Sequence, residues 1–241
     1  MNAQSPPEIK RRYESVLERL DAACSAAGRP RKGVKLVAVS KQCPAQAVSV
    51  IAAAGQVDFG ESYVQEAVKK REELSGDPAC ENIRWHMIGH VQSRKVADVA
   101  GAYALLHTLD SRKLAAALER RLTALGARQA VLLQINIADE PQKSGAAPGD
   151  LLVLTDYIMN ECPHLELGGL MCLPPVFDAG EAARPHFARL YALRESLRSR
   201  LNLALPELSM GMSGDFAAAV AEGATLVRIG TDIFGERQSK H

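Results

Sequence analysis

The segment VKLVAVS, at positions 34–40, is a short and almost continuously apolar run, and Lys41 follows it directly. A run of this length without polar alternation is typical of a strand that is buried on both faces, as in a parallel sheet. Seven similar stretches recur along the chain, at 57–60, 83–89, 104–110, 130–137, 165–173, 207–213 and 225–235. The sequence therefore predicts eight buried strands, with amphipathic helical patterns between them.

Eight buried strands that alternate with helices favour a closed (β/α)8 TIM barrel, an α/β fold for which about 250 residues is the usual length. We place the barrel at about 34–237 and predict that the whole chain, 1–241, is a single domain. The alternative is a doubly wound open sheet, but no GxGxxG motif follows the first strand. An extra N-terminal helix is predicted over 7–27, where apolar side chains recur with helical spacing. We expect it to cap the barrel or to cover its side.

Composition and charge argue against several classes of function. The 29 basic and 28 acidic side chains give a formal net charge of +1, so no overall field attracts nucleic acid or an anionic membrane. No apolar run reaches the ~18 to 20 residues of a membrane span, and the N-terminus lacks the apolar core of a signal peptide. The five cysteines form no CxxC pair, so we predict reduced thiols and no metal site. We therefore expect a soluble, cytoplasmic protein.

Lys41 lies where a functional site is expected, because (β/α)8 barrels form their sites at the carboxyl ends of the strands. Burying a lysine ammonium group is costly unless the group is paired or neutral. Burial favours the neutral amine, which is the nucleophile that Schiff-base chemistry needs. A lysine that extends from the strand end into solvent is the simpler alternative, and position alone leaves both open.

Two loops with glycine follow the last two strands. Ser213 and Gly214 precede the helical pattern DFAAAVAEG, and Gly230 with Thr231 ends the eighth strand pattern. Barrels frequently bind phosphate at these two loops, through backbone N–H groups. A tight turn explains each glycine alone. Together with Lys41, however, the two loops indicate a phosphorylated carbonyl compound as the ligand.

Arg228 lies inside the apolar pattern TLVRIG, two residues before Gly230. A buried guanidinium stays charged and needs an acceptor. Either a carboxylate from a neighbouring strand or the ring nitrogen of pyridoxal 5′-phosphate (PLP) would supply one. An arginine at that nitrogen disfavours protonation of the ring and weakens the cofactor as an electron sink. We assign no role to His86 or His107, for which packing in the barrel beside a hydrogen-bonded neighbour is the simpler explanation.

Most of the chain resembles the PLP homeostasis protein family, also known as YggS-like proteins or proline synthase co-transcribed homologues. Their barrel is similar to the N-terminal domain of bacterial alanine racemase, which is a fold type III PLP-binding barrel. The matching segments are LVAVSK (36–41), FGESYVQEAVKK (59–70), WHMIGHVQSRK (85–95), HTLDSRKL (107–114), LLQINIADEPQKSG (132–145), GGLMCLPP (168–175) and LSMGMSGDFAAAVAEGATLVRIGTDIFGER (208–237).

The resemblance implies a role for six residues. Lys41 forms the aldimine with PLP and Arg228 faces the pyridine nitrogen, while the phosphate is contacted by Ser209, Ser213, Gly230 and Thr231. Two positions depart from the family pattern: Ser62 replaces the asparagine of FGEN, and Arg94 replaces the asparagine of QSNK. The first departure weakens a role for Ser62 at the cofactor. The second adds a positive charge at the rim of the site.

The function implied by the resemblance is reversible PLP binding, with buffering or delivery of the cofactor to apo PLP-dependent enzymes and no dedicated catalytic activity. The alternative is a PLP-dependent amino-acid racemase or a related fold type III enzyme. A racemase of this type has a second, β-rich domain and a catalytic tyrosine from beyond the barrel, whereas all five tyrosines here precede the last strand. Since that second domain also carries the dimer surface, we expect a monomer. A Schiff-base aldolase without cofactor, with Glu61 as its acid–base group, is a third possibility.

Overall fold

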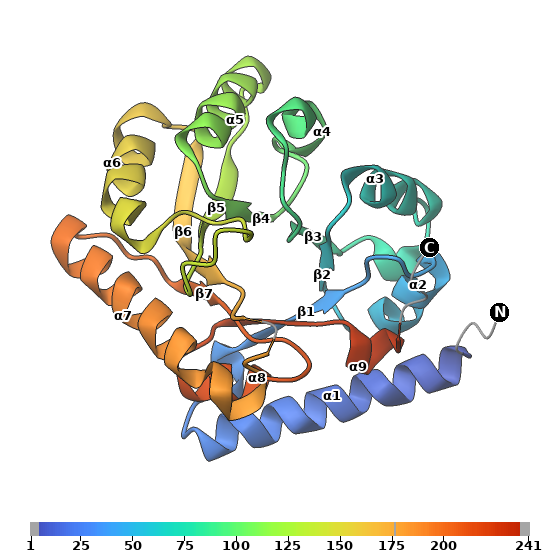
Figure 1. Cartoon of the computed structure of the whole chain (residues 1–241). Helices are drawn as coiled ribbons and strands as arrows, with labels where there is room; N and C mark the ends of the chain where they lie inside the picture. The colour runs from blue at the N-terminus through green and yellow to red at the C-terminus, as the bar shows by residue number, and fades with distance from the viewer. Residues whose placement is uncertain (1–4, 176, 237–241) are drawn as a thin grey trace.

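Eight parallel strands form a closed barrel in the computed structural model, which describes residues 5–175 and 177–236 (Figure 1). Each strand pairs with its neighbours in the sequence, and β8 pairs with β1. The predicted (β/α)8 fold is confirmed, and the open doubly wound sheet is wrong because none of the described strands keeps a free edge. The strands are β1 (Lys35–Val39), β2 (Asp58–Glu61), β3 (Arg84–Met87), β4 (Leu105–Leu109), β5 (Gln129–Ile135), β6 (Leu165–Cys172), β7 (Glu207–Ser209) and β8 (Leu226–Ile229).

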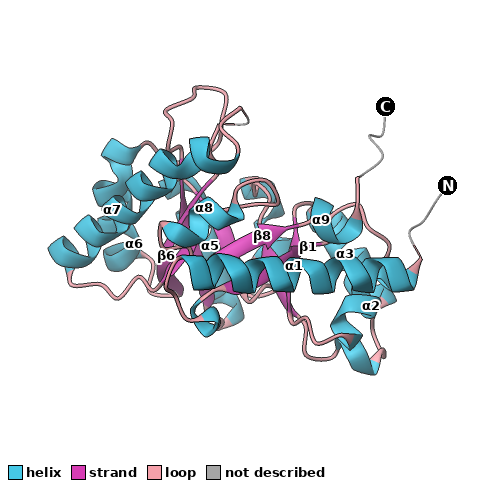
Figure 2. Ribbon diagram, turned by 90° about the horizontal axis from the view of Figure 1, so that it is seen from below, coloured by secondary structure: helices cyan, strands magenta, loops and turns pink. Residues whose placement is uncertain are grey.

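A helix follows every strand, and the helices surround the barrel (Figures 1 and 2). They are α2 (Ala45–Ala53), α3 (Val64–Glu73), α4 (Val96–Val99), α5 (Arg112–Leu125), α6 (Leu151–Glu161), α7 (Arg184–Leu201), α8 (Phe216–Ala221) and α9 (Thr231–Phe234). Short 3-10 turns lie in the connections, at Arg31–Gly33, Pro78–Cys80, Ser93–Lys95, Pro148–Asp150 and Gly180–Ala183. No described helix combines the length and the apolar character that a membrane crossing requires.

The N-terminal helix α1 (Pro6–Ala26) covers the side of the barrel. It packs against α2, α8 and α9, across the part of the wall that β8 and β1 form (Figure 2). Its buried stripe has the predicted helical spacing and consists of Ile9, Tyr13, Val16, Leu20 and Cys24. Because the helix after β8 has only four residues, α1 provides the apolar cover that this part of the wall needs.

Strands β7 and β8 are shorter than the sequence predicted. The apolar pattern continues to position 213, but β7 ends at Ser209, because Gly211 takes a φ of +92° and turns the chain. The N–H of Met212 then donates to the Asp215 carboxylate over 2.5 Å. After β8, the residues that we assigned to strand form α9 instead. Position 237, where we placed the end of the barrel, lies outside the described residues.

The barrel interior contains a small apolar cluster that is separate from the main core. Five strands contribute one buried side chain each, namely Val37, Leu105, Leu132, Met171 and Leu226. The larger cluster lies between the outer faces of the strands and the helices. Along these five strands, side chains that face the barrel interior alternate with side chains that face the helices, as expected for a filled (β/α)8 barrel.

Two adjacent glycines in β6 have different surroundings. Gly168 is left unpaired where the register between β5 and β6 shifts, and a methyl group there would meet Leu132 at an ordinary 3.7 Å. Gly169 pairs with Glu207 of β7 and has a φ of +153°. A Cβ atom on Gly169 would overlap the carbonyl oxygen of Glu207. The β6–β7 ladder therefore requires glycine at 169 and not at 168.

We expect Gly169→Ala to lower the free energy of unfolding by about 3 kcal/mol, because it combines an unfavourable φ with an overlap in the sheet. The neighbouring control Gly168→Ala should change it by no more than about 1 kcal/mol. Urea unfolding followed by far-ultraviolet circular dichroism measures both. Equal free energies of unfolding for the two variants would contradict this account of the ladder.

Candidate functional site

The backbone on both sides of Lys41 is held by polar contacts from behind the barrel wall. Lys70 on α3 donates to the carbonyl oxygen of Ser40 over 2.6 Å. The N–H of Gln42, which has a φ of +61°, donates to a carboxylate oxygen of Glu66 on the same helix. These contacts fix the turn in which β1 ends. Lys41 itself is half-buried at the mouth of the barrel.

Glu61 belongs to the same group of contacts and faces away from the mouth. Its Oε1 accepts from the Ser40 hydroxyl and from Lys70, both at 2.6 Å. Its side chain is fully buried, and burial raises the pKa of Glu61 although the contacts with Lys70 and Ser40 oppose the rise. Glu61 is not among the residues that line the cavity beside Lys41. The acid–base group that the aldolase alternative needs therefore lies outside that cavity.

A cavity of about 730 Å³ opens beside Lys41 at the carboxyl ends of the strands. This volume is in the range of about 300 to 1,000 Å³ that is usual for sites that bind small molecules. The loops after five strands line it, with Lys41, Ser62, Tyr63, Val64, Gln65, Ile88, Gly89, His90, Gln92, Arg94, Lys95, Gln134, Ile135, Asn136, Gln142, Lys143, Ser144 and Leu173. Ser62 and Arg94, the two departures from the family pattern, are both in the wall.

The loop between β5 and α6 folds over this cavity. Asn136 ties its start, since the side-chain amide donates to the carbonyl oxygen of Glu140 over 2.8 Å. Lys143 ties its middle to the loop after β6, by donating to the carbonyl oxygen of Pro174 over 3.0 Å. Gly145 is required close to the strand, because a Cβ there would lie 2.6 Å from the backbone nitrogen of Asn136.

The predicted phosphate loops lie next to Lys41 in barrel order. Ser213 follows β7, Gly230 and Thr231 follow β8, and Lys41 follows β1, which are three consecutive strands of the closed barrel. The carbonyl oxygen of Gly211 accepts from the backbone N–H of Arg228, which joins the β7 loop to β8. None of Ser213, Gly230 and Thr231 lines the large cavity, which extends from Lys41 towards the strands on its other side. Their phosphate role stays a prediction.

A row of buried polar side chains crosses the inside of the barrel. Asp58 Oδ1 lies 2.9 Å from Nε2 of His86, and Nδ1 of His86 lies 2.9 Å from Nε2 of His107. Nδ1 of His107 lies 2.8 Å from the Ser209 hydroxyl, which accepts from Arg228 over 2.6 Å. We refer to these five residues as the interior relay. Both histidines are packed in the barrel beside hydrogen-bonded neighbours, as we expected.

His107 is at the centre of the interior relay and is completely buried. Burial holds the pKa of His107 well below its ordinary value, and the nearby guanidinium of Arg228 acts in the same direction. The ring is therefore neutral at physiological pH, with one nitrogen that donates and one that accepts.

Arg228 points into the barrel, as predicted, but its partners are neutral. Besides Ser209, it donates to the carbonyl oxygen of Cys172 over 3.0 Å. Within the described residues, no carboxylate oxygen lies at ion-pair distance from its guanidinium, so the carboxylate that we considered as its acceptor is absent there. Burial lowers the pKa of Arg228, but an arginine remains charged at neutral pH.

Ser209 lies deeper than a phosphate contact requires. It is fully buried, and its hydroxyl group is in contact with both His107 and Arg228. A hydroxyl group has one hydrogen, and a phosphate dianion only accepts. Ser209 therefore cannot donate to both His107 and a phosphate, and its contact with the phosphate stays a prediction.

Several residues of the cavity wall were missed by the sequence reasoning. Tyr63, at the start of α3, lines the cavity with Lys41, and so do Lys95 and Lys143. They lie in loops, where a single sequence carries no periodic signal. The available clue was that polar residues follow each strand pattern, since every one of the missed residues lies in a loop between a strand and the next helix.

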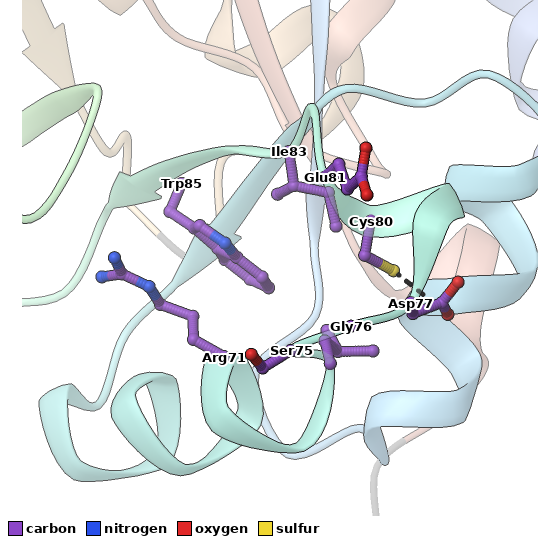
Figure 3. A pocket seen from close by; sticks show the side chains of 9 residues that line it. Arg71, Ser75, Gly76, Asp77, Cys80, Glu81, Ile83 and Trp85 are labelled. Atoms are coloured by element: carbon purple, nitrogen blue, oxygen red, sulfur yellow. Dashed lines mark hydrogen bonds between the residues drawn. The ribbon is translucent and has the colours of Figure 1, made fainter.

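A second cavity, of about 340 Å³, lies at the opposite ends of the strands (Figure 3). It is formed between the end of α3 and the start of β3, where Trp85 lies above the end of α3 and the Cys80 sulfur points to Asp77 (Figure 3). None of the predicted site residues lines it. Because (β/α)8 barrels place their chemistry at the carboxyl ends of the strands, the larger cavity beside Lys41 is the candidate site.

Comparisons with known proteins identify the family of this chain. The family model described as "Alanine racemase, N-terminal domain" matches residues 14–238. A pyridoxal phosphate homeostasis protein of Pseudomonas aeruginosa is 44% identical over 229 residues, which cover 95% of this chain and 96% of that protein. PipY of Synechococcus elongatus, solved with PLP bound, is 34% identical with a TM-score of 0.78, covering 90% of this chain and 99% of that one.

Alanine racemase itself shares the fold. The enzyme of Corynebacterium glutamicum has a TM-score of 0.68 at 17% identity, and the match covers 93% of this chain but 61% of the racemase chain. The near-complete matches at higher identity confirm the predicted family. The chain therefore belongs to the pyridoxal phosphate homeostasis proteins, a family built on the alanine racemase N-terminal domain.

Proposed function

We propose that the protein binds PLP through Lys41 and takes part in PLP homeostasis, by holding the cofactor reversibly and by buffering or delivering it. The observation that carries the proposal is the position of Lys41, in the wall of a cavity at the carboxyl ends of the strands. PLP supplies an aldehyde, whose carbon condenses with a lysine amine and releases water in a reversible reaction. The PLP-bound structure of PipY, a relative with the same fold, supports this choice of ligand.

The residues present fit the phosphate end of PLP. Ser213, Gly230 and Thr231 follow the two strands next to β1, so a ligand that reaches Lys41 also reaches these loops. We propose that their backbone N–H groups and two hydroxyl groups hold the phosphate. For Ser209 we propose support of Arg228 as its part in cofactor binding, because its hydroxyl oxygen accepts from Arg228.

The fixed charge of the cavity also suits an anionic cofactor. Lys41, Arg94, Lys95 and Lys143 are all part of its wall. Glu140 offsets one of these charges by contacting Lys143 at 2.6 Å. The positive charges of Arg94 and Lys95 favour entry of a phosphate dianion, although the protein has almost no net charge overall. Arg94, which departs from the family pattern, adds to this field.

We propose a carrier rather than an enzyme with a dedicated substrate. Arg228 at the ring nitrogen would leave the ring unprotonated, because a guanidinium can only donate there. An unprotonated ring is a poor electron sink for reactions at an amino-acid α-carbon. The homeostasis names of the relatives agree with a carrier. We further propose a monomer in the cytoplasm, with the whole chain, 1–241, as one PLP-binding domain and apo PLP-dependent enzymes as recipients.

Lys41→Ala should abolish the visible absorption band that the purified, PLP-loaded protein is expected to have, because the amine that bonds to the aldehyde is removed. Lys69→Ala is the matched control, since the Lys69 side chain on α3 is 79% exposed and is not among the residues that line the cavity. Absorption spectra before and after borohydride reduction measure the covalent bond. A band that persists in Lys41→Ala would overturn the assignment of Lys41.

The carrier proposal is tested by measuring the racemisation of amino acids and the transfer of PLP to an apo enzyme. We expect no robust racemisation of alanine or other amino acids by the loaded protein, and we expect reactivation of an apo PLP enzyme when the two are mixed. Chiral chromatography follows racemisation, and the rate of reactivation is compared with the rate of PLP release into buffer. Robust turnover that is lost in Lys41→Ala and in Tyr63→Phe would establish an enzyme instead, with Tyr63 as its second acid–base group.

A further inference from the structure

The interior relay has one permitted direction of hydrogen bonding when both histidines are neutral. Arg228 donates to Ser209 and cannot accept. The hydroxyl hydrogen of Ser209 is then available to Nδ1 of His107, which accepts it. A neutral His107 carries its own hydrogen on Nε2 and donates it to Nδ1 of His86. The Ser209 oxygen could also accept from both neighbours, so this direction is selected by the group at the other end of the interior relay.

Asp58 ends the interior relay with a group that only accepts. Burial acts to raise the pKa of Asp58, but hydrogen bonds from His86 and Arg84 together lower it below its ordinary value, so the carboxylate is ionised at neutral pH. Its Oδ1 accepts from Nε2 of His86, and its Oδ2 accepts from Arg84 over 2.7 Å. When both histidines are neutral, both are therefore held as Nε2–H tautomers, and each contact of the interior relay joins one donor to one acceptor.

The two ends of the interior relay lie in different parts of the barrel. Asp58 begins β2, next to the half-exposed side chain of Arg84, whereas Arg228 is the third residue of β8 and precedes the Gly230 loop. Hydrogen bonds in such a series polarise one another in a buried setting. The carboxylate at one end therefore influences the guanidinium at the other, although the two side chains do not touch.

We propose that Asp58 is a positioning residue of the PLP site, which fixes the tautomers of His86 and His107 and so directs the hydroxyl hydrogen of Ser209 to His107, away from the ligand, while the Ser209 oxygen anchors Arg228 towards the cofactor ring. This inference rests on the proposed function, because Arg228 is the residue that we place at the ring nitrogen. It assigns a role in cofactor binding to three residues, Asp58, His86 and His107, that lie outside the cavity.

The variant Asp58→Asn tests the direction of the relay with little change of shape. Arg84 can only donate, so it selects the orientation in which the new amide oxygen faces Arg84 and the amide nitrogen faces His86. Nε2 of His86 must then accept, so its hydrogen moves to Nδ1. The same reversal at His107 makes Nδ1 a donor to Ser209. The hydroxyl hydrogen of Ser209 is released from His107 and can compete with Arg228 for the ligand.

We expect long-range ¹⁵N–¹H correlation spectra of the protein before PLP loading to show Nε2–H tautomers for His86 and His107, and Nδ1–H tautomers for both in Asp58→Asn. In protein loaded with PLP labelled with ¹⁵N in the ring, the ring-nitrogen resonance should shift in Asp58→Asn. The dissociation constant for PLP should rise about tenfold, as expected for the weakening of one charged hydrogen bond. Asp156→Asn, on the exposed face of α6, is the matched control and should change none of the three.

Ser209→Ala provides a second variant in case Asp58→Asn does not fold. It removes the link between His107 and Arg228, so it should shift the ring-nitrogen resonance while both histidines keep their tautomers. Nδ1–H tautomers or imidazolium forms in the wild-type protein at neutral pH would overturn the proposal. So would unchanged tautomers in a folded Asp58→Asn, or a reversal that leaves the ring nitrogen unaffected. The visible band that depends on Lys41 tests the proposed function separately, because the tautomers are measured without cofactor.

Discussion

The pairing of β8 with β1 is the interaction on which the rest of the site depends. Residues 35–38 align with residues 226–229 in a parallel ladder that closes the barrel. This register opposes Val37 to Arg228, so both side chains face the interior, and it brings the Gly230 loop next to Lys41. A shift of β8 by one residue against β1 would turn Arg228 outward to the helices, while Lys41 would keep its place at the end of β1. The site is therefore a product of closure and not of any single loop.

Closure also encloses polar groups whose burial is unfavourable unless every donor meets an acceptor. Inside the barrel, the interior relay meets this condition with five side chains from five strands. Behind the wall, Lys70 meets it with Glu61, Glu66 and the carbonyl oxygen of Ser40. The first group reaches Arg228 and the second fixes the turn at Lys41. Two independent polar groups thus hold the two ends of the site in a structure that is otherwise apolar at its centre.

The sequence predicted the barrel well because its evidence is local and repeated. Eight apolar runs with helices between them identify the strands, and the spacing of apolar residues identifies α1 almost to its ends. Apolarity alone, however, continues past the end of β7, where only the φ of Gly211 stops the strand. Lys41 and Arg228 could be singled out as candidate site residues because Lys41 directly follows an apolar run and Arg228 interrupts one. The link between His86, His107 and Ser209 was not found, because it depends on which strands become neighbours across the barrel, and no short segment contains that information.

The helix α1 packs against α8 and α9, so the first and the last helices of the described chain stabilise each other. Contacts between residues so far apart in sequence form slowly and are the last to be completed as a chain is made. During synthesis, β1 therefore has an unpaired edge and α1 an uncovered apolar stripe until β8 has left the ribosome. The proposed PLP site, which needs β7, β8 and β1 side by side, is among the last features of the described barrel to form. On that proposal, a nascent chain can hold the cofactor only after the segment that forms β8 has been translated.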